Sequence, residues 1–118
     1  MGDARLLFSR LRRRRKVIMS LADLPDRVKI GDAHYTILYQ LEITDEKDEK
    51  LLGQCDFQSC TIKVVPNSNT YKNTLRHELV HAISYFMNAD LTEKQVDQVC
   101  NGLGMLFIDN PKLKDTIL

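Results

Sequence analysis

The sequence predicts an α+β fold, in which a small, mostly antiparallel sheet is followed by two packed helices. Up to residue 65, apolar residues alternate with polar ones at the period of two that is typical of half-buried strands. From residue 70 onward they recur every three or four positions, the period of a helix with one buried face. Because the strands precede the helices rather than alternate with them, we expect helices packed on one face of the sheet. At 118 residues, the chain is long enough for one domain with a single core.

The first strand pair is predicted in the stretch from Asp26 to Ile43, which contains the turn-forming pair Gly31 and Asp32. Large apolar residues alternate with polar ones on both sides of this turn: Val28, Ile30, Tyr35, Ile37, Tyr39 and Leu41. The charge-dense stretch TDEKDEK follows, from Thr44 to Lys50, and is expected to form a solvated loop.

A second strand pair is predicted in the stretch LLGQCDFQSCTIKVV, from Leu51 to Val65. Its second arm runs from Cys60 to Val65 and is ended by Pro66 and the turn-forming residues Asn67 to Asn69. We expect this second arm to form an edge of the sheet, close to the helix that follows it in the chain.

The first helix is predicted after these turn residues, where Ser68 or Asn69 can cap its start. Its expected buried stripe consists of residues three or four positions apart: Leu75, Leu79, Ala82, Ile83 and Phe86. Two histidines of this helix lie along a neighbouring face.

The second helix has a clear start signal. Thr92 and Gln95 form a capping box, and Leu91 and Val96 form a hydrophobic staple around it. The expected buried side consists of Val96, Val99, Cys100, Leu103, Leu106 and Phe107. The sequence Asp109-Asn110-Pro111 ends the helix.

Two glycines, Gly102 and Gly104, lie inside this second helix. Each costs about 1 kcal/mol relative to alanine. We expect them to permit the close approach of another backbone, such as that of the histidine-containing helix.

The charge of the chain is divided unevenly between two segments. The formal net charge is +1, but residues 1–18 contain seven lysines and arginines and one aspartate. The remaining hundred residues are therefore acidic, which does not suit a nucleic-acid-binding surface. We expect residues 1–18 to be a basic, disordered leader ahead of a domain formed by residues 19–118. Residues 10–16 can alternatively act as an arm for nucleic acid or a membrane surface, or form a short helix that packs on the body.

The cysteines and the apolar runs indicate a cytoplasmic location. Three cysteines without a secretory signal are typical of free thiols in a reducing compartment. No apolar run approaches the length needed to span a bilayer, so a membrane partner is not expected.

The stretch HELVH contains the motif H-E-x-x-H, formed by His77, Glu78 and His81. Side chains at positions i and i+4 of a helix lie one turn apart on the same face, so the two imidazoles can bind one ion. Glu78 is rotated away from both ligands and can act as a general base. Two of the three histidines in the chain belong to this pattern, which predicts a zinc site. Iron, cobalt or nickel would accept the same ligand atoms.

A catalytic zinc site needs a third protein ligand. Glu93 is the candidate, because it opens the second helix and comes near His81 if that helix folds back across the first. Asp97, one turn later, is the alternative third ligand or a partner of a ligand. Glu93 can also be a simple charge that favours the helix start through the helix dipole.

The stretches TLRHELVHAISYF and LTEKQVDQVCNGLGMLF resemble the ImmA/IrrE family of metallopeptidases and its small phage-encoded relatives, the minimal zincin-like proteins. That family follows H-E-x-x-H with a helix of the form E-x-x-A-N-x-F-A-x-x-L. The positions that correspond to this second pattern are Glu93, Val96, Asp97, Val99 and Leu103. The resemblance extends from about Val28 to Phe107 and implies a zincin-like fold with Glu93 as a metal ligand. SprT-like metalloproteases share the short motif and are the nearest competing family.

The motif and the resemblance together imply a zinc-dependent peptidase acting on a protein or peptide substrate, such as a repressor of a phage or mobile element. Glu78 would take a proton from the attacking water and pass it to the leaving amine. Tyr71 and Tyr85 are candidates for stabilising the charge on the carbonyl oxygen, although both can equally be packing residues. The expected edge strand, Cys60 to Val65, can receive an extended peptide by backbone pairing.

The sequence is also compatible with two other functions. The first is a catalytically inactive metal-binding interaction module with a zincin-like fold. The second is tethering to nucleic acid through residues 10–16.

Overall fold

The computed structural model describes residues 24–66 and 70–118 and shows a small α+β fold. The strands are β1 (Arg27–Ile30), β2 (Ala33–Tyr39), β3 (Ile43–Thr44), β4 (Lys50–Leu51), β5 (Gly53–Asp56) and β6 (Thr61–Val64). The helices are α2 (Tyr71–Phe86), α3 (Glu93–Asp109) and α4 (Leu113–Ile117), of which α4 was not predicted. The basic leader and the expected cap residues Ser68 and Asn69 lie outside the described residues, and the N-cap residue of α2 is Thr70. Within the described ranges, no helix combines the length and the apolar composition that crossing a lipid bilayer requires.

The main sheet has the order β1-β2-β6-β5, with mixed pairing. β1 and β2 form the predicted hairpin around Gly31, and β5 and β6 form the second predicted hairpin. β2 and β6 pair in parallel, with Thr36 opposite Thr61 and Tyr39 opposite Val64. The short strands β3 and β4 form a separate antiparallel pair around the charged loop.

The expectation that Cys60 to Val65 forms a sheet edge is wrong. β6 lies between β2 and β5, so its backbone groups are paired on both sides. The edge strands are β1 and β5, and neither pairs with a further strand in the part of the chain that the structure describes. The hairpin pattern identifies two paired arms but does not indicate which arm finds the additional partner.

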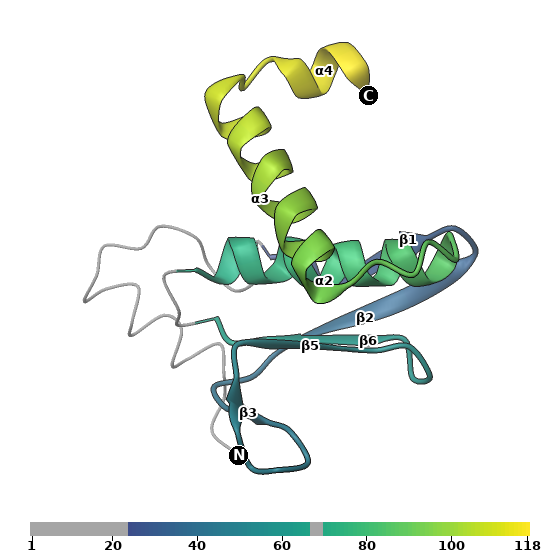
Figure 1. Ribbon diagram of the computed structural model, residues 1–118, viewed down its shortest axis with the longest axis vertical. Helices are drawn as coiled ribbons and strands as arrows, with labels where there is room; N and C mark the ends of the chain where they lie inside the picture. Colours follow the sequence, from purple (N-terminus) through teal and green to yellow (C-terminus); the bar gives the residue numbers. More distant parts are fainter. Residues whose placement is uncertain (1–23, 67–69) are drawn as a thin grey trace.

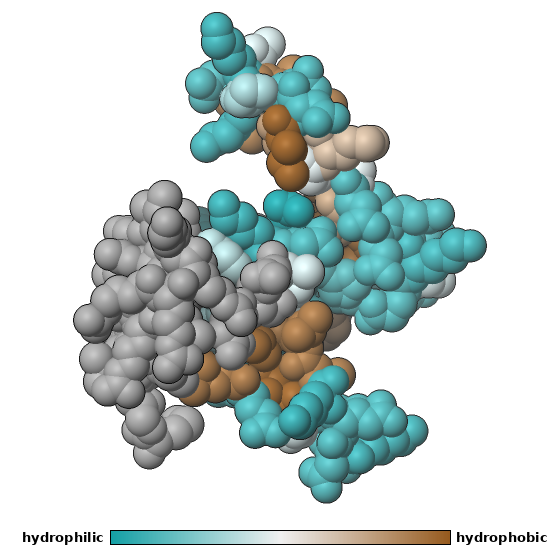
Figure 2. Space-filling view, turned by 90° about the vertical axis from the view of Figure 1, so that its left-hand side faces the viewer, coloured by the Kyte–Doolittle hydropathy of each residue, from teal (hydrophilic) through white to brown (hydrophobic). Residues whose placement is uncertain are grey.

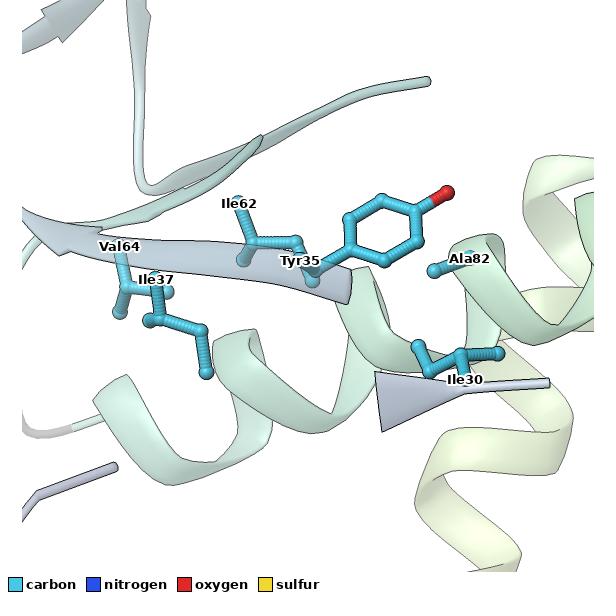
Figure 3. Close-up of a cluster of buried hydrophobic side chains, with 6 residues drawn as sticks. All are labelled: Ile30, Tyr35, Ile37, Ile62, Val64 and Ala82. Carbon is cyan, nitrogen blue, oxygen red and sulfur yellow. The ribbon is translucent and has the colours of Figure 1, made fainter. Parts of the chain in front are cut away.

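The hydrophobic core lies between the sheet and α2, which runs across one face of the sheet (Figure 1). β1, β2 and β6 each contribute to it, and Ala82 of α2 packs against them. Figure 3 shows the six buried side chains: Ile30, Tyr35, Ile37, Ile62, Val64 and Ala82. Ile83 and Phe86, which were expected to be buried, are 47% and 48% exposed. The ring of Phe86 instead lies over Gly31. This glycine, with a φ of +61°, is part of the β1–β2 turn.

α3 packs on α2 rather than on the sheet, through a second small core of Val80, Val96 and Cys100. The prediction that its whole apolar side is buried is wrong. Only the first half of α3 crosses α2, and the second half extends away from the body (Figure 1). Leu103 and Leu106 of the expected buried side are therefore 38% and 39% exposed, and Val99, on the first half of α3, is also 42% exposed. In Figure 2, hydrophobic side chains lie among polar ones on the surface of this upper part of the molecule.

The two glycines of α3 have different surroundings. A Cβ on Gly104 would lie 2.8 Å from a guanidinium nitrogen of Arg76, so this glycine makes room for a side chain of α2 rather than for its backbone. A Cβ on Gly102 would meet no atom within 4 Å. The expected backbone approach is therefore absent at both positions among the described residues.

Candidate metal centre

Three candidate ligands come together where α3 begins above the middle of α2. The Nε2 atoms of His77 and His81 are 3.1 Å apart. One carboxylate oxygen of Glu93 lies 3.1 Å from Nε2 of His77, and the other lies 3.0 Å from Nε2 of His81. No further residue of the described chain joins these three as a possible ligand of the same ion.

These separations fit a zinc ion. Ligand atoms in a tetrahedral zinc site lie about 2.0 to 2.1 Å from the ion and therefore roughly 3.4 Å from one another. The observed separations of 3.0 to 3.1 Å are within a few tenths of an ångström of that value. Two imidazoles and one carboxylate are also a donor set typical of catalytic zinc, with a fourth position left for water or substrate.

Local sequence signals position Glu93. Thr92 and Gln95 form the predicted capping box, in which each side chain accepts a hydrogen bond from the other residue's backbone N–H. Leu91 packs against the α2–α3 core, as the predicted staple requires. Its backbone N–H donates to Oγ of Ser84, which is a buried residue of α2. The first residue of α3 is thus held directly above the histidines.

Asp97 does not join the three converging donors. Its Oδ1 lies 2.9 Å from Nδ1 of His77, on the opposite side of the imidazole from Nε2. A proton on Nδ1 is donated to this carboxylate, which leaves the lone pair of Nε2 free to bind a metal. Asp97 is therefore placed as an orienting partner of His77 rather than as the alternative third ligand.

Glu78 lies beside the donors and is only 8% exposed. Burial raises the pKa of Glu78 to about 7, with His77 opposing the rise and the Glu93 carboxylate adding to it. A carboxyl group with a pKa near neutrality is suited to taking up and returning a proton. β5 passes directly over this carboxyl group, since a Cβ on Gly53 would lie 3.1 Å from Oε2 of Glu78 and 2.5 Å from Cγ2 of Thr74.

A cavity of about 430 Å³ lies over the donors. The side of the cavity opposite the donors is formed by β5 and the residues that flank it: Leu51, Gly53, Gln54, Cys55 and Phe57. Sequence reasoning missed these residues, because a predicted hairpin does not indicate that its first arm borders the histidines. Burial and the nearby Glu78 carboxylate raise the pKa of the Cys55 thiol to about 12. Cys55 therefore lines the cavity as a neutral thiol.

The two candidate tyrosines do not line this cavity. Tyr71 is partly buried and packs against the core between α2 and the sheet. Tyr85 is 62% exposed, and its ring stacks on Phe57 with a centroid distance of 4.2 Å.

The chain was compared with protein-family models, with curated proteins and with solved structures. It matches none of them.

Proposed function

We propose that this chain is a zinc-dependent metallopeptidase with a zincin-like fold, similar to the ImmA/IrrE family. The observation that carries the proposal is the approach of His77, His81 and Glu93 to within 3.1 Å of one another. The buried Glu78 next to them completes the set of groups that peptide hydrolysis needs. In this proposal the protein is cytoplasmic and its substrate is a protein or peptide, such as a regulatory protein of a phage or mobile element.

A bound zinc ion would supply a Lewis acid, which acidifies water and polarises a carbonyl group. His77 and His81 would hold the ion through Nε2, and Glu93 through its carboxylate. Asp97 keeps the His77 ring in the required orientation and tautomer. Glu78 takes the proton from the attacking water and returns it to the leaving amine.

The free edge of β5 gives a place for the substrate backbone. An extended peptide can add to a sheet edge through main-chain hydrogen bonds. Because Gly53 lies directly over Glu78, a peptide that pairs with β5 passes close to both the base and the donors. The peptide-binding role expected for β6 is therefore assigned to β5.

The test is metal content and cleavage in matched variants. Purified protein should contain about one zinc per chain by elemental analysis, and the double variant H77A/H81A should contain none. A proteome-derived peptide library, read by mass spectrometry, should be cleaved by the zinc-loaded protein. E78Q should keep its zinc and lose cleavage by a factor of about 100 or more, the usual size of a general-base contribution.

E46Q is the control, because Glu46 is an exposed carboxylate in the loop between β3 and β4. It should retain both zinc and cleavage. Undiminished cleavage by E78Q, or unchanged zinc content in H77A/H81A, would contradict the proposal.

A second candidate function is a metal-binding interaction module without hydrolysis. The exposed apolar residues of α3, Val99, Leu103 and Leu106, favour it, because exposed apolar surface is typical of interaction sites. In that case the zinc content would behave as described above, but no peptide in the library would be cleaved.

A further inference from the structure

A second hollow, of about 580 Å³, lies beside the cavity over the metal donors. His81 and Phe57 line both spaces, so the two are neighbours that share a wall. The remaining lining residues come from the end of α2 and from the segment that leads to α3: Ser84, Tyr85, Asn88, Asp90 and Leu91. A volume of this size is within the range of about 300 to 1,000 Å³ that ligand pockets occupy. A side chain of a bound peptide that points away from β5, past His81, would enter this hollow.

One part of the wall is aromatic. The rings of Phe57 and Tyr85 are nearly parallel, with an interplanar angle of 5°. Tyr85 is 62% exposed, which leaves most of its ring accessible. Flat aromatic faces attract the aliphatic stems of long side chains and also cations.

Another part of the wall carries a negative charge. Asp90 is exposed and lies on the segment between α2 and α3. Within residues 24–66 and 70–118, no lysine, arginine or histidine forms an ion pair with it. Asp90 is the one carboxylate among the residues that line the hollow.

The segment that carries Asp90 is held in place from both ends. The backbone N–H of Ala89 donates to the carbonyl oxygen of Ser84, and that of Leu91 donates to the Ser84 hydroxyl oxygen. Asn88 and Asp90 have φ values of 54° and 53°, a left-handed conformation that these residue types adopt more readily than most others. The carboxylate of Asp90 is thus attached to a fixed backbone at the wall of the hollow.

We propose that this hollow binds a lysine or arginine side chain next to the cleaved bond, so that the substrates are peptides with a basic residue at that position. The proposal rests on the proposed function. The stem of such a side chain packs on Leu91 and the aromatic pair, and its cationic end meets Asp90. An apolar side chain would cover the Asp90 carboxylate without pairing it, and an acidic side chain would be repelled by it. A basic side chain is therefore the kind of side chain that both the aromatic part and the acidic part of the wall of the hollow favour.

The experiment compares two hexapeptides that differ in one atom group. One contains five alanines and one arginine, and the other contains citrulline, the neutral analogue of arginine, at the same place. Cleavage by the zinc-loaded wild-type protein is measured for both peptides. Binding is measured separately by fluorescence anisotropy, with labelled peptides and the zinc-loaded E78Q variant, so that it does not depend on hydrolysis.

The wild-type protein should prefer the arginine peptide by roughly three- to thirtyfold, the combined effect of an exposed ion pair and a cation–π contact. D90N, combined with E78Q for the binding measurement, should reduce this ratio to near one. D109N is the matched control, because Asp109 is an exposed aspartate at the far end of α3, and it should keep the full preference.

Each outcome separates the two proposals. Cleavage with no preference for arginine would overturn the basic pocket and leave the peptidase standing. Arginine-selective binding that depends on Asp90, without any cleavage, would support the pocket and overturn the peptidase. A preference that survives in D90N would overturn the assignment of this hollow. Absence of both cleavage and selective binding would overturn both proposals.

Discussion

His77 faces a different partner with each of its ring nitrogens. Nε2 points toward His81 and Glu93, and Nδ1 lies 2.9 Å from Asp97. A histidine that binds a metal usually donates its other N–H to a carboxylate, which orients the ring and makes the ligand more basic. Asp97 lies four positions after Glu93, on the next turn of α3, so one candidate ligand and the residue that orients another candidate ligand come from the same helix face.

We therefore predict that D97N weakens zinc binding by roughly 10- to 100-fold while leaving the fold intact. The amide keeps the size of the carboxylate but cannot stabilise the Nδ1 proton as strongly. Zinc affinity can be measured by competition with a chromogenic chelator. H34N is a suitable control, because His34 is an exposed residue of β2 outside the donor cluster, and it should bind zinc as the wild type does. An unchanged affinity in D97N would show that the His77 ring does not need this contact.

At the scale of elements, the close contact between β5 and α2 determines what lies above Glu78. Gly53 is a point of close approach, because a Cβ there would lie 2.5 Å from Cγ2 of Thr74. A larger residue at this point would force the strand away from the helix. The distance between the sheet edge and the buried carboxyl group therefore depends on the absence of one side chain.

Two glycine-to-alanine substitutions should have opposite effects on stability. G53A should lower the free energy of unfolding by roughly 1 to 3 kcal/mol, the usual cost of an overpacked contact. G102A should raise it by about 0.5 to 1 kcal/mol, because Gly102 lies inside α3 and its Cβ would meet nothing within 4 Å. Urea unfolding followed by circular dichroism measures both. Equal effects of the two substitutions would contradict the tight packing of β5 on α2.

The elements themselves were largely predictable from the sequence, because their signals are local. The capping box at Thr92 and the alternation around Gly31 each depend on a few neighbouring residues, and both are present in the structure. The partner of β6 was not predictable, because its parallel pairing with β2 joins residues far apart in the chain. The exposure of Leu103 was not predictable either. The spacing of apolar residues identifies the apolar face of a helix, but it does not show how much of that face another helix covers.

The candidate site was predictable in its histidines and less so in its surroundings. The spacing of His77 and His81 on one helix was enough to predict that they lie together. Placing Glu93 near them required the second helix to fold back, and the structure has this arrangement. Phe57 gave no signal in the sequence, because its position at the site depends on the β5–β6 hairpin lying over α2.

At the scale of the whole molecule, the donor cluster joins the two main helices. Apart from it, α3 is attached to α2 mainly through Val80, Val96 and Cys100. An ion bound by His77, His81 and Glu93 would connect the helices at a second place. The stability of the molecule should therefore depend on the metal.

Removing the metal should lower the melting temperature. A ligand present at 1,000 times its Kd adds about 4.1 kcal/mol to the folded state, which corresponds to a shift of roughly 10 °C or more for a chain of this size. Differential scanning calorimetry with and without EDTA measures the shift. H77A should melt at the same temperature in both conditions. If the wild-type protein melts at the same temperature with saturating zinc and with EDTA, a metal link between the helices is contradicted.

The positions of the donors in the chain also bear on the order in which the molecule folds. His77 and Glu93 are separated by 16 residues, and they meet through one helical hairpin. Contacts between such near neighbours form faster than the parallel pairing of β2 with β6, which must close a longer loop. If the proposed site binds a cation, the helical hairpin can therefore bind it while the strands are still unpaired, and metal supply during synthesis would then speed folding.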